Sequence, residues 1–81
     1  MNSFKRGFVS SVTPPPIIEI EGNRRVNLEG SRGVLHYSDT LIRISLGTFV
    51  AVFEGRSLRL QCISPTSLIL EGFFTDIHFE M

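Results

Sequence analysis

Side chains able to bind a metal alternate along a short segment near the C-terminus: Asp76, His78 and Glu80. Alternate residues of a β-strand point to the same face of a sheet, and strand parity places His36 on that face too. Carboxylate and imidazole groups can hold zinc, so a small metal-dependent enzyme using His36, Asp76 and His78 is one alternative. Charges at a strand end are usually solvated, however, and no ligand cluster elsewhere completes a set. The sequence therefore predicts no metal site.

The single cysteine, Cys62, could act as a nucleophile beside a histidine. The strand registers described below place Cys62 on the inner face of the sheet and both histidines on the outer face. A lone buried cysteine usually packs as a small apolar residue, so slow reaction with thiol reagents is expected. Residues 30–33 lack the lysine and the following helix of a phosphate-binding loop. No catalytic residue, cofactor or small-molecule substrate is predicted, and the chain is not expected to be an enzyme.

The composition narrows the classes of partner. Among 81 residues, eight basic and eight acidic side chains cancel, and 42% of residues are hydrophobic. Nucleic acid or an anionic membrane as the main ligand would require a basic surplus, so neither is predicted. A high apolar fraction without net charge favours self-association, and a homo-oligomer is expected. The lone cysteine excludes an internal disulfide, as in a reducing cytosol. No apolar run reaches the roughly 18 residues of a membrane span, and no signal peptide is recognised.

The elements that must position these side chains are strands. Residues 1–16 are predicted to be a flexible N-terminal tail with a proline-rich spacer, and residues 17–81 a single β domain. A phrase of two alternating apolar positions followed by Glu and Gly occurs four times in the domain, ending at Gly22, Gly30, Gly55 and Gly72. Alternation is typical of a strand and glycine of a turn, and no segment has helical periodicity.

Short turns predict the strand registers, because each turn must bring apolar residues onto one face. Gly47, Gly55 and Gly72 are each expected to open a two-residue type II′ turn with positive φ. The predicted pairs include Ile18–Leu28, Ile20–Val26, Tyr37–Ile42, Leu35–Ile44, Ile42–Phe53, Ile44–Ala51, Phe53–Leu58, Leu60–Leu70, Cys62–Leu68 and Leu70–Thr75. The predicted fold is all-β, an antiparallel meander of about eight short strands curled into a sandwich or barrel-like sheet.

One parity runs through these turns and divides the side chains between two faces. The predicted inner face comprises Leu35, Tyr37, Ile42, Ile44, Leu46, Phe49, Ala51, Phe53, Leu58, Leu60, Cys62, Leu68, Leu70, Ile77 and Phe79. The outer face is mostly polar, but six apolar residues on it are predicted to form an interaction surface: Leu41, Val50, Val52, Ile63, Ile69 and Phe74. The alternative is that the N-terminal strands of the same chain cover these residues.

Several segments of the domain also match a known pattern. The most specific is residues 33–39, Gly-Val-Leu-His-Tyr-Ser-Asp, which Gly47, Gly55 and Gly72 follow. With the Glu-Gly phrases, this pattern resembles the YabP/YqfC family of sporulation proteins of endospore-forming bacteria, over roughly residues 16–80. The resemblance implies a non-enzymatic protein of forespore envelope or coat assembly, typically paired with a membrane protein. It also implies a location in the mother-cell cytoplasm, peripheral to the forespore membrane or coat. A generic β-domain adaptor outside sporulation is the alternative.

Overall fold

The computed structural model describes residues 15–81, so nearly all of the predicted N-terminal tail lies outside the described residues. All the regular secondary structure in this part of the chain is β-strand, which confirms the predicted all-β class. No helix among these residues is long and apolar enough to cross a membrane. The strands are β2 (Ile17–Glu21), β3 (Arg25–Glu29), β4 (Gly33–Tyr37), β5 (Leu41–Ser45), β6 (Val50–Cys62) and β7 (Ser67–Glu80).

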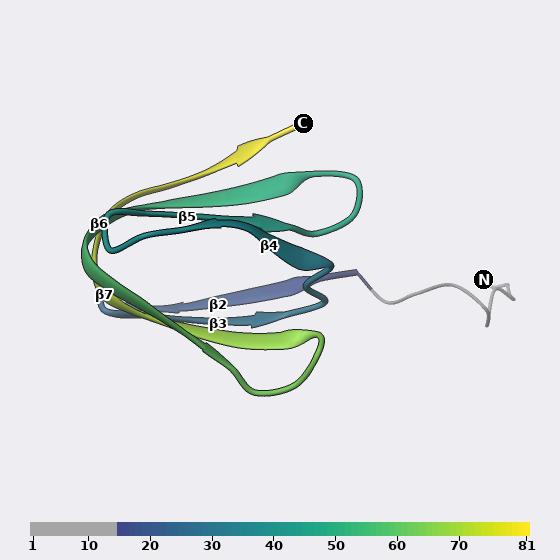
Figure 1. The fold of residues 1–81 in the computed structure, drawn as a ribbon, viewed down its shortest axis with the longest axis horizontal. Coiled ribbons are helices and arrows are strands. Elements are labelled where there is room, and N and C mark those ends of the chain that lie inside the picture. Colours follow the sequence, from purple (N-terminus) through teal and green to yellow (C-terminus); the bar gives the residue numbers. More distant parts are fainter. Residues whose placement is uncertain (1–14) are drawn as a thin grey trace, which may run out of the picture.

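The six strands form one antiparallel sheet in the order β2-β3-β7-β6-β5-β4. Figure 1 shows that this sheet folds over on itself into two layers. The β2–β3 hairpin lies in one layer and the β4–β5 hairpin in the other, while the long strands β6 and β7 bend and run through both. Strands β4 to β7 form the predicted antiparallel meander, but β3 pairs with β7 rather than with β4, so the meander does not extend over the whole domain. The described sheet ends at β2 and β4 and is not closed into a barrel.

Two of the predicted hairpin turns are bends inside long strands, which explains why six strands replace the expected eight. Gly55 lies within β6 and Gly72 within β7, and the two strands remain paired on either side of them. The register shifts beside Gly55, and Ser57 has a φ of 53°. Positive φ is confirmed at Gly47 and Gly72 but not at Gly55. A glycine in a strand pattern is as compatible with a bulge or bend as with a turn, so the pattern alone does not distinguish them.

Most of the predicted pairs within the remaining hairpins are present. Ile20 pairs with Val26, and Ile42 pairs with Tyr37 on one side and Phe53 on the other. The pairs Ile18–Leu28, Ile44–Ala51, Leu60–Leu70 and Cys62–Leu68 are also present. The predicted pairs Leu35–Ile44, Phe53–Leu58 and Leu70–Thr75 are wrong. The first fails because a register shift in β4 brings Val34 opposite Ile44, and the other two required turns at the bends.

The core lies between the two layers. Its buried members are Val26, Leu28, Ile42, Ile44, Leu46, Ala51, Phe53, Leu58, Leu68, Leu70 and Phe74. Phe53 packs edge-to-face against Phe74, with 6.1 Å between ring centroids. Four residues predicted to face inward are exposed instead: Leu35, Tyr37, Cys62 and Phe79. They lie on an edge strand or at strand ends. Alternation along a strand decides which face of the sheet a side chain points to, but the side chain is buried only where another layer covers that face.

Each hairpin places its turn against one of the two bends. In the β2–β3 turn, the carbonyls of Asn23 and Arg24 accept hydrogen bonds from the amides of Phe74 (2.8 Å) and Gly72 (3.1 Å). In the β4–β5 turn, the carbonyls of Asp39 and Thr40 likewise accept from the amides of Leu58 (2.9 Å) and Gly55 (3.1 Å). A bend disrupts the ladder and leaves amides that need acceptors. The turns supply them, so the hairpins and the bends stabilise each other.

Candidate functional site

The six residues predicted to form an interaction surface do not form one patch. Leu41, Val50 and Val52 lie on β5 and β6 in the layer of the β4–β5 hairpin. Ile69 pairs with Asn27 and Gln61 in the other layer, and Ile63 lies just after β6. Leu41, Val50 and Ile69 are half-buried, while Ile63 is 55% exposed. The outer faces of the two layers point away from each other, so a single partner surface does not reach all of them.

Phe74 and Val52 are buried and are therefore not available to a partner. Phe74 belongs to the core because the register shift beside Gly55 leaves Thr75 unpaired in the ladder and turns Phe74 inward. Val52 is only 2% exposed but lies outside the core cluster. An ion pair between Arg43 on β5 and Glu80 on β7, 2.6 Å long, spans β6 beside it. Polar side chains of the outer face therefore cover Val52, which corrects its predicted exposure.

Both edge strands expose large apolar side chains: β2 at Ile17 and Ile20, and β4, where the sequence placed Leu35 and Tyr37 on the inner face. All five residues of β4 are exposed. Val34, Leu35 and Tyr37 have exposed fractions of 40, 53 and 50%. The Tyr37 hydroxyl accepts a hydrogen bond of 3.3 Å from the amide of Leu60, so β4 is tied to β6. This surface, the β4 edge, was missed because the expected registers provide no information on which strand lies at an edge.

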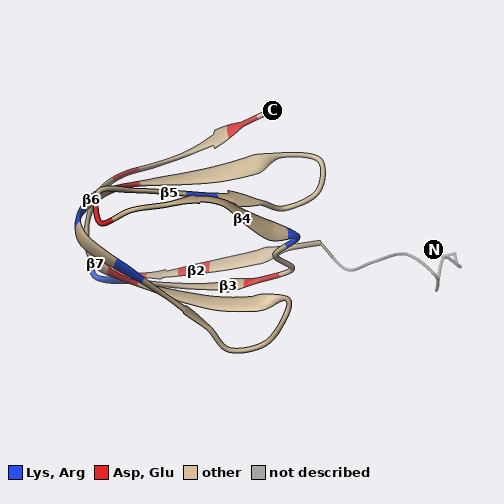
Figure 2. Ribbon diagram, in the orientation of Figure 1, with Lys and Arg blue, Asp and Glu red and all other residues tan. Residues whose placement is uncertain are grey.

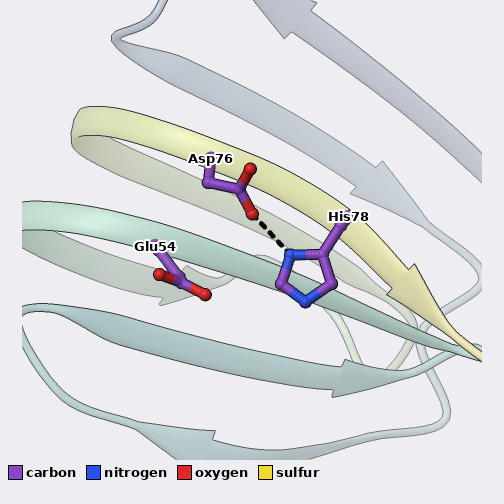
Figure 3. A group of neighbouring side chains, drawn as sticks. All are labelled: Glu54, Asp76 and His78. Carbon is purple, nitrogen blue, oxygen red and sulfur yellow. Dashed lines mark hydrogen bonds and ion pairs between the residues drawn. The ribbon is translucent and has the colours of Figure 1, made fainter.

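A second group of side chains, with metal-binding chemistry, lies on the outer face of β6 and β7 (Figure 3). Glu54 pairs with Asp76 across the ladder, and His78 follows two residues later. Their potential ligand atoms lie within 4.8 Å of one another. His78 Nδ1 is 2.5 Å from Asp76 Oδ2, so the carboxylate orients the ring and leaves Nε2 free. Three ligands on an exposed face would leave the other coordination positions of a cation to water.

The structure does not bring together the three residues of the enzyme alternative. His36 is separated from His78 by Arg43 and Val52, one on each intervening strand. Neighbouring strands lie about 4.8 Å apart, and His36 and His78 are three such spacings apart. The two histidines therefore cannot bind the same metal ion. Glu80 is engaged by Arg43 rather than by this group. Glu54, which the sequence did not single out, takes the place expected for His36. The absence of a metal site stays a prediction.

Cys62 is exposed at the end of β6, which contradicts its predicted inward burial. Its ladder partner Leu68 is buried, but the end of β6 extends beyond the covering layer. We therefore expect the native thiol to react with a reagent such as DTNB at a rate within about tenfold of the unfolded chain. Absorbance measured with and without denaturant gives both rates. Stronger protection in the native protein would place the thiol inside, as the sequence predicted.

Comparisons with protein-family models, with curated proteins and with solved structures find no match to this chain.

Proposed function

We propose that this chain is a non-catalytic β module that assembles through the β4 edge with a second copy of itself. The observation that supports this most directly is the exposure of Val34, Leu35 and Tyr37 on β4, which within residues 15–81 pairs on one side only, with β5. An edge strand presents free backbone groups, and clustered exposed apolar side chains are typical of an interface. Burial of such side chains contributes about 1.5–3 kcal/mol each when complete.

The contact runs mainly through side chains. The register shift between Val34 and His36 interrupts the regular ladder of β4, and such bulges oppose continuous pairing with another strand. The hydrogen bond to Leu60 holds the Tyr37 ring at the edge before a partner arrives. Ordering this side chain in advance lowers the entropic cost of association.

The proposed cellular setting is assembly of the forespore envelope or coat, with a membrane protein as a further partner. The support is the resemblance to the YabP/YqfC family. Its most specific segment, residues 33–39, comprises β4 and the start of the following turn. The segment that carries the resemblance is thus also the segment proposed to make the contact.

Leu35→Lys tests the contact. Placing a charge on the β4 edge is expected to weaken self-association at least tenfold, since a lysine has to be desolvated in the interface. Ile63→Lys is the matched control, because Ile63 is equally exposed (55% against 53%) but lies after β6. Sedimentation velocity over a concentration series measures both. A wild-type monomer at high micromolar concentration, or equal effects of the two substitutions, would contradict assembly through this edge.

The setting is tested separately in an endospore-forming host that carries the gene. The transcript is expected to be absent during vegetative growth and to appear after sporulation begins. A neighbouring gene is expected to encode a membrane protein. Constitutive expression would instead favour the generic adaptor outside sporulation.

A further inference from the structure

A cleft opens on the surface at the bend of the folded sheet, and no residue of β4 lines it. Its volume is about 450 Å³, within the range of small-molecule sites. Four parts of the chain line it: the β2–β3 turn with the start of β3, the β4–β5 turn at Asp39, the bend of β6 at Ser57 and the bend of β7 at Phe73. Backbone hydrogen bonds join the β2–β3 turn to β7 and the β4–β5 turn to β6. The cleft is therefore built into the fold.

Positive charge gathers around this cleft. Arg24, Arg25 and Arg59 line it, and Arg56 lies beside it against Phe73. They are four of the six arginines in residues 15–81, and Figure 2 shows basic segments at the bend with acidic segments beside them. The acidic residues of the lining are Asp39 and Glu71. Among the lining residues, three guanidinium charges against two carboxylates leave a surplus of one, and Arg56 adds a positive charge beside it, although the whole chain has no net charge.

Arg24 is held in place before any ligand binds. Its Cζ atom lies 4.2 Å from the centre of the Phe73 ring, and its Nε donates a hydrogen bond of 3.2 Å to the carbonyl of Gly72. Arg56 lies against the same ring at 5.0 Å. A guanidinium stacked on a ring keeps its in-plane N–H groups free for an oxyanion. Among residues 15–81, no acceptor binds the two terminal nitrogens of Arg24.

The Glu71 carboxylate does not satisfy the hydrogen-bond donors of the neighbouring arginines. The closest approaches to Glu71 are 3.7 Å from Arg25 Nε and 3.6 Å from a terminal nitrogen of Arg59, which is too long for hydrogen bonds. Arg25 Nε is buried and has no hydrogen-bond partner within the described residues. A buried donor without an acceptor is costly. The cleft thus contains guanidinium N–H donors without acceptors as well as a positive charge.

We propose that the cleft binds a phosphate monoester, with Arg24, Arg25 and Arg59 as its ligands. The monoester carries about −1.5 to −2 charges at pH 7 and three acceptor oxygens, which suits three lining arginines with several unused donors. A carboxylate has only two acceptor oxygens, fewer than these donors can use. The cleft has room for the organic group of the ester. This site is independent of assembly through the β4 edge, and either proposal can fail without the other.

Binding is measured by NMR titration of the ¹⁵N-labelled protein with phenyl phosphate, and with dimethyl phosphate, a diester, at equal ionic strength. The monoester is expected to shift the amides of Ser57, Gly72 and Phe73 at millimolar concentration, and the diester to bind more weakly. A second experiment asks whether the ester can be a lipid headgroup. Phosphatidylcholine vesicles containing phosphatidic acid, a monoester, are compared with vesicles containing phosphatidylglycerol, a diester. Preference for the monoester in the titration supports the site. If the vesicles containing phosphatidic acid are also preferred, the ester can be a lipid headgroup; if they are not, it is a soluble monoester.

Arg24→Gln and Arg59→Gln are each expected to weaken phenyl phosphate binding about tenfold or more, since each removes a charged donor. Arg59 has a 77% exposed side chain, so its substitution leaves the fold intact. Arg32→Gln is the control: it removes the same charge from the β3–β4 link, outside this cleft. Unchanged affinity in both cleft variants would overturn the proposal. Equal losses in all three variants, or shifts at residues far from the bend, would do the same.

Discussion

Replacing Gly55 with alanine should lower the free energy of unfolding by about 3 kcal/mol or more, as strain in a well-packed region does. An added Cβ would lie 2.0 Å from the Phe73 carbonyl oxygen and 3.0 Å from Phe74 Cα. These are backbone atoms of β7, which the ladder and the buried Phe74 ring hold in place. The strands must separate at the bend to make room. Urea denaturation followed by circular dichroism measures the loss.

Gly22→Ala is the control for this substitution. Gly22 has a φ of 56°, and a Cβ there would meet nothing within 4 Å. The expected loss is only about 1–2 kcal/mol, the cost of a left-handed conformation for a residue with a side chain. Gly55 does not have positive φ, so the two variants separate steric contact from backbone strain. A smaller loss at Gly55 than at Gly22 would show that the two long strands do not approach as closely as described.

Phe53→Ala should cost about 3–5 kcal/mol, the usual range for a buried aromatic residue. Phe53 has no exposed surface, lies in the core between the layers and packs against Phe74. Truncation leaves a cavity that neither layer can fill, because both are constrained by the same two bent strands. Single domains are stable by only about 5–15 kcal/mol, so partial unfolding is expected. The midpoint and slope of urea denaturation report it.

Phe79→Ala provides the comparison within the same inward-facing row of residues. Phe79 also makes an edge-to-face pair, with Phe49 at 5.5 Å, but it is 54% exposed. Its truncation is expected to cost about 1 kcal/mol, mainly the aromatic pair and partial burial. Equal losses of unfolding free energy in Phe53→Ala and Phe79→Ala would contradict a core centred on Phe53. They would mean that the end of β7 is buried as deeply as the space between the layers.

Alternation and turn length determine much of the local structure of this chain. The pairs Ile20–Val26 and Ile42–Phe53 follow from the sequence because the residues are close along the chain and a slip by one position would turn apolar side chains outward. The exclusion of helices within residues 15–81 follows from the same period of two. These are short-range constraints, and a single sequence is sufficient to express them.

The tertiary structure alone decides what the four Glu-Gly phrases do. Gly22 and Gly30 follow the ends of β2 and β3, whereas Gly55 and Gly72 lie inside strands that continue past them. The residues themselves are similar. The difference is that β6 and β7 remain paired on both sides of Gly55 and Gly72, and the turns of the two other hairpins accept hydrogen bonds from their amides. This stabilises a bend where the local pattern would equally allow a turn.

The functional surfaces depend on the same long-range arrangement. Tyr37 lies on the predicted side of its strand yet is half exposed, because β4 lies at the edge of the described sheet and no other strand of residues 15–81 covers it. Arg24 and Arg59 are far apart in the sequence and meet only because β3 pairs with β7 and both long strands bend. Composition reports that the total charge is zero, but only the folded chain determines where the charges lie. The sequence thus specifies strands and their faces, and the pairing of distant strands decides which residues are exposed and which charges come together.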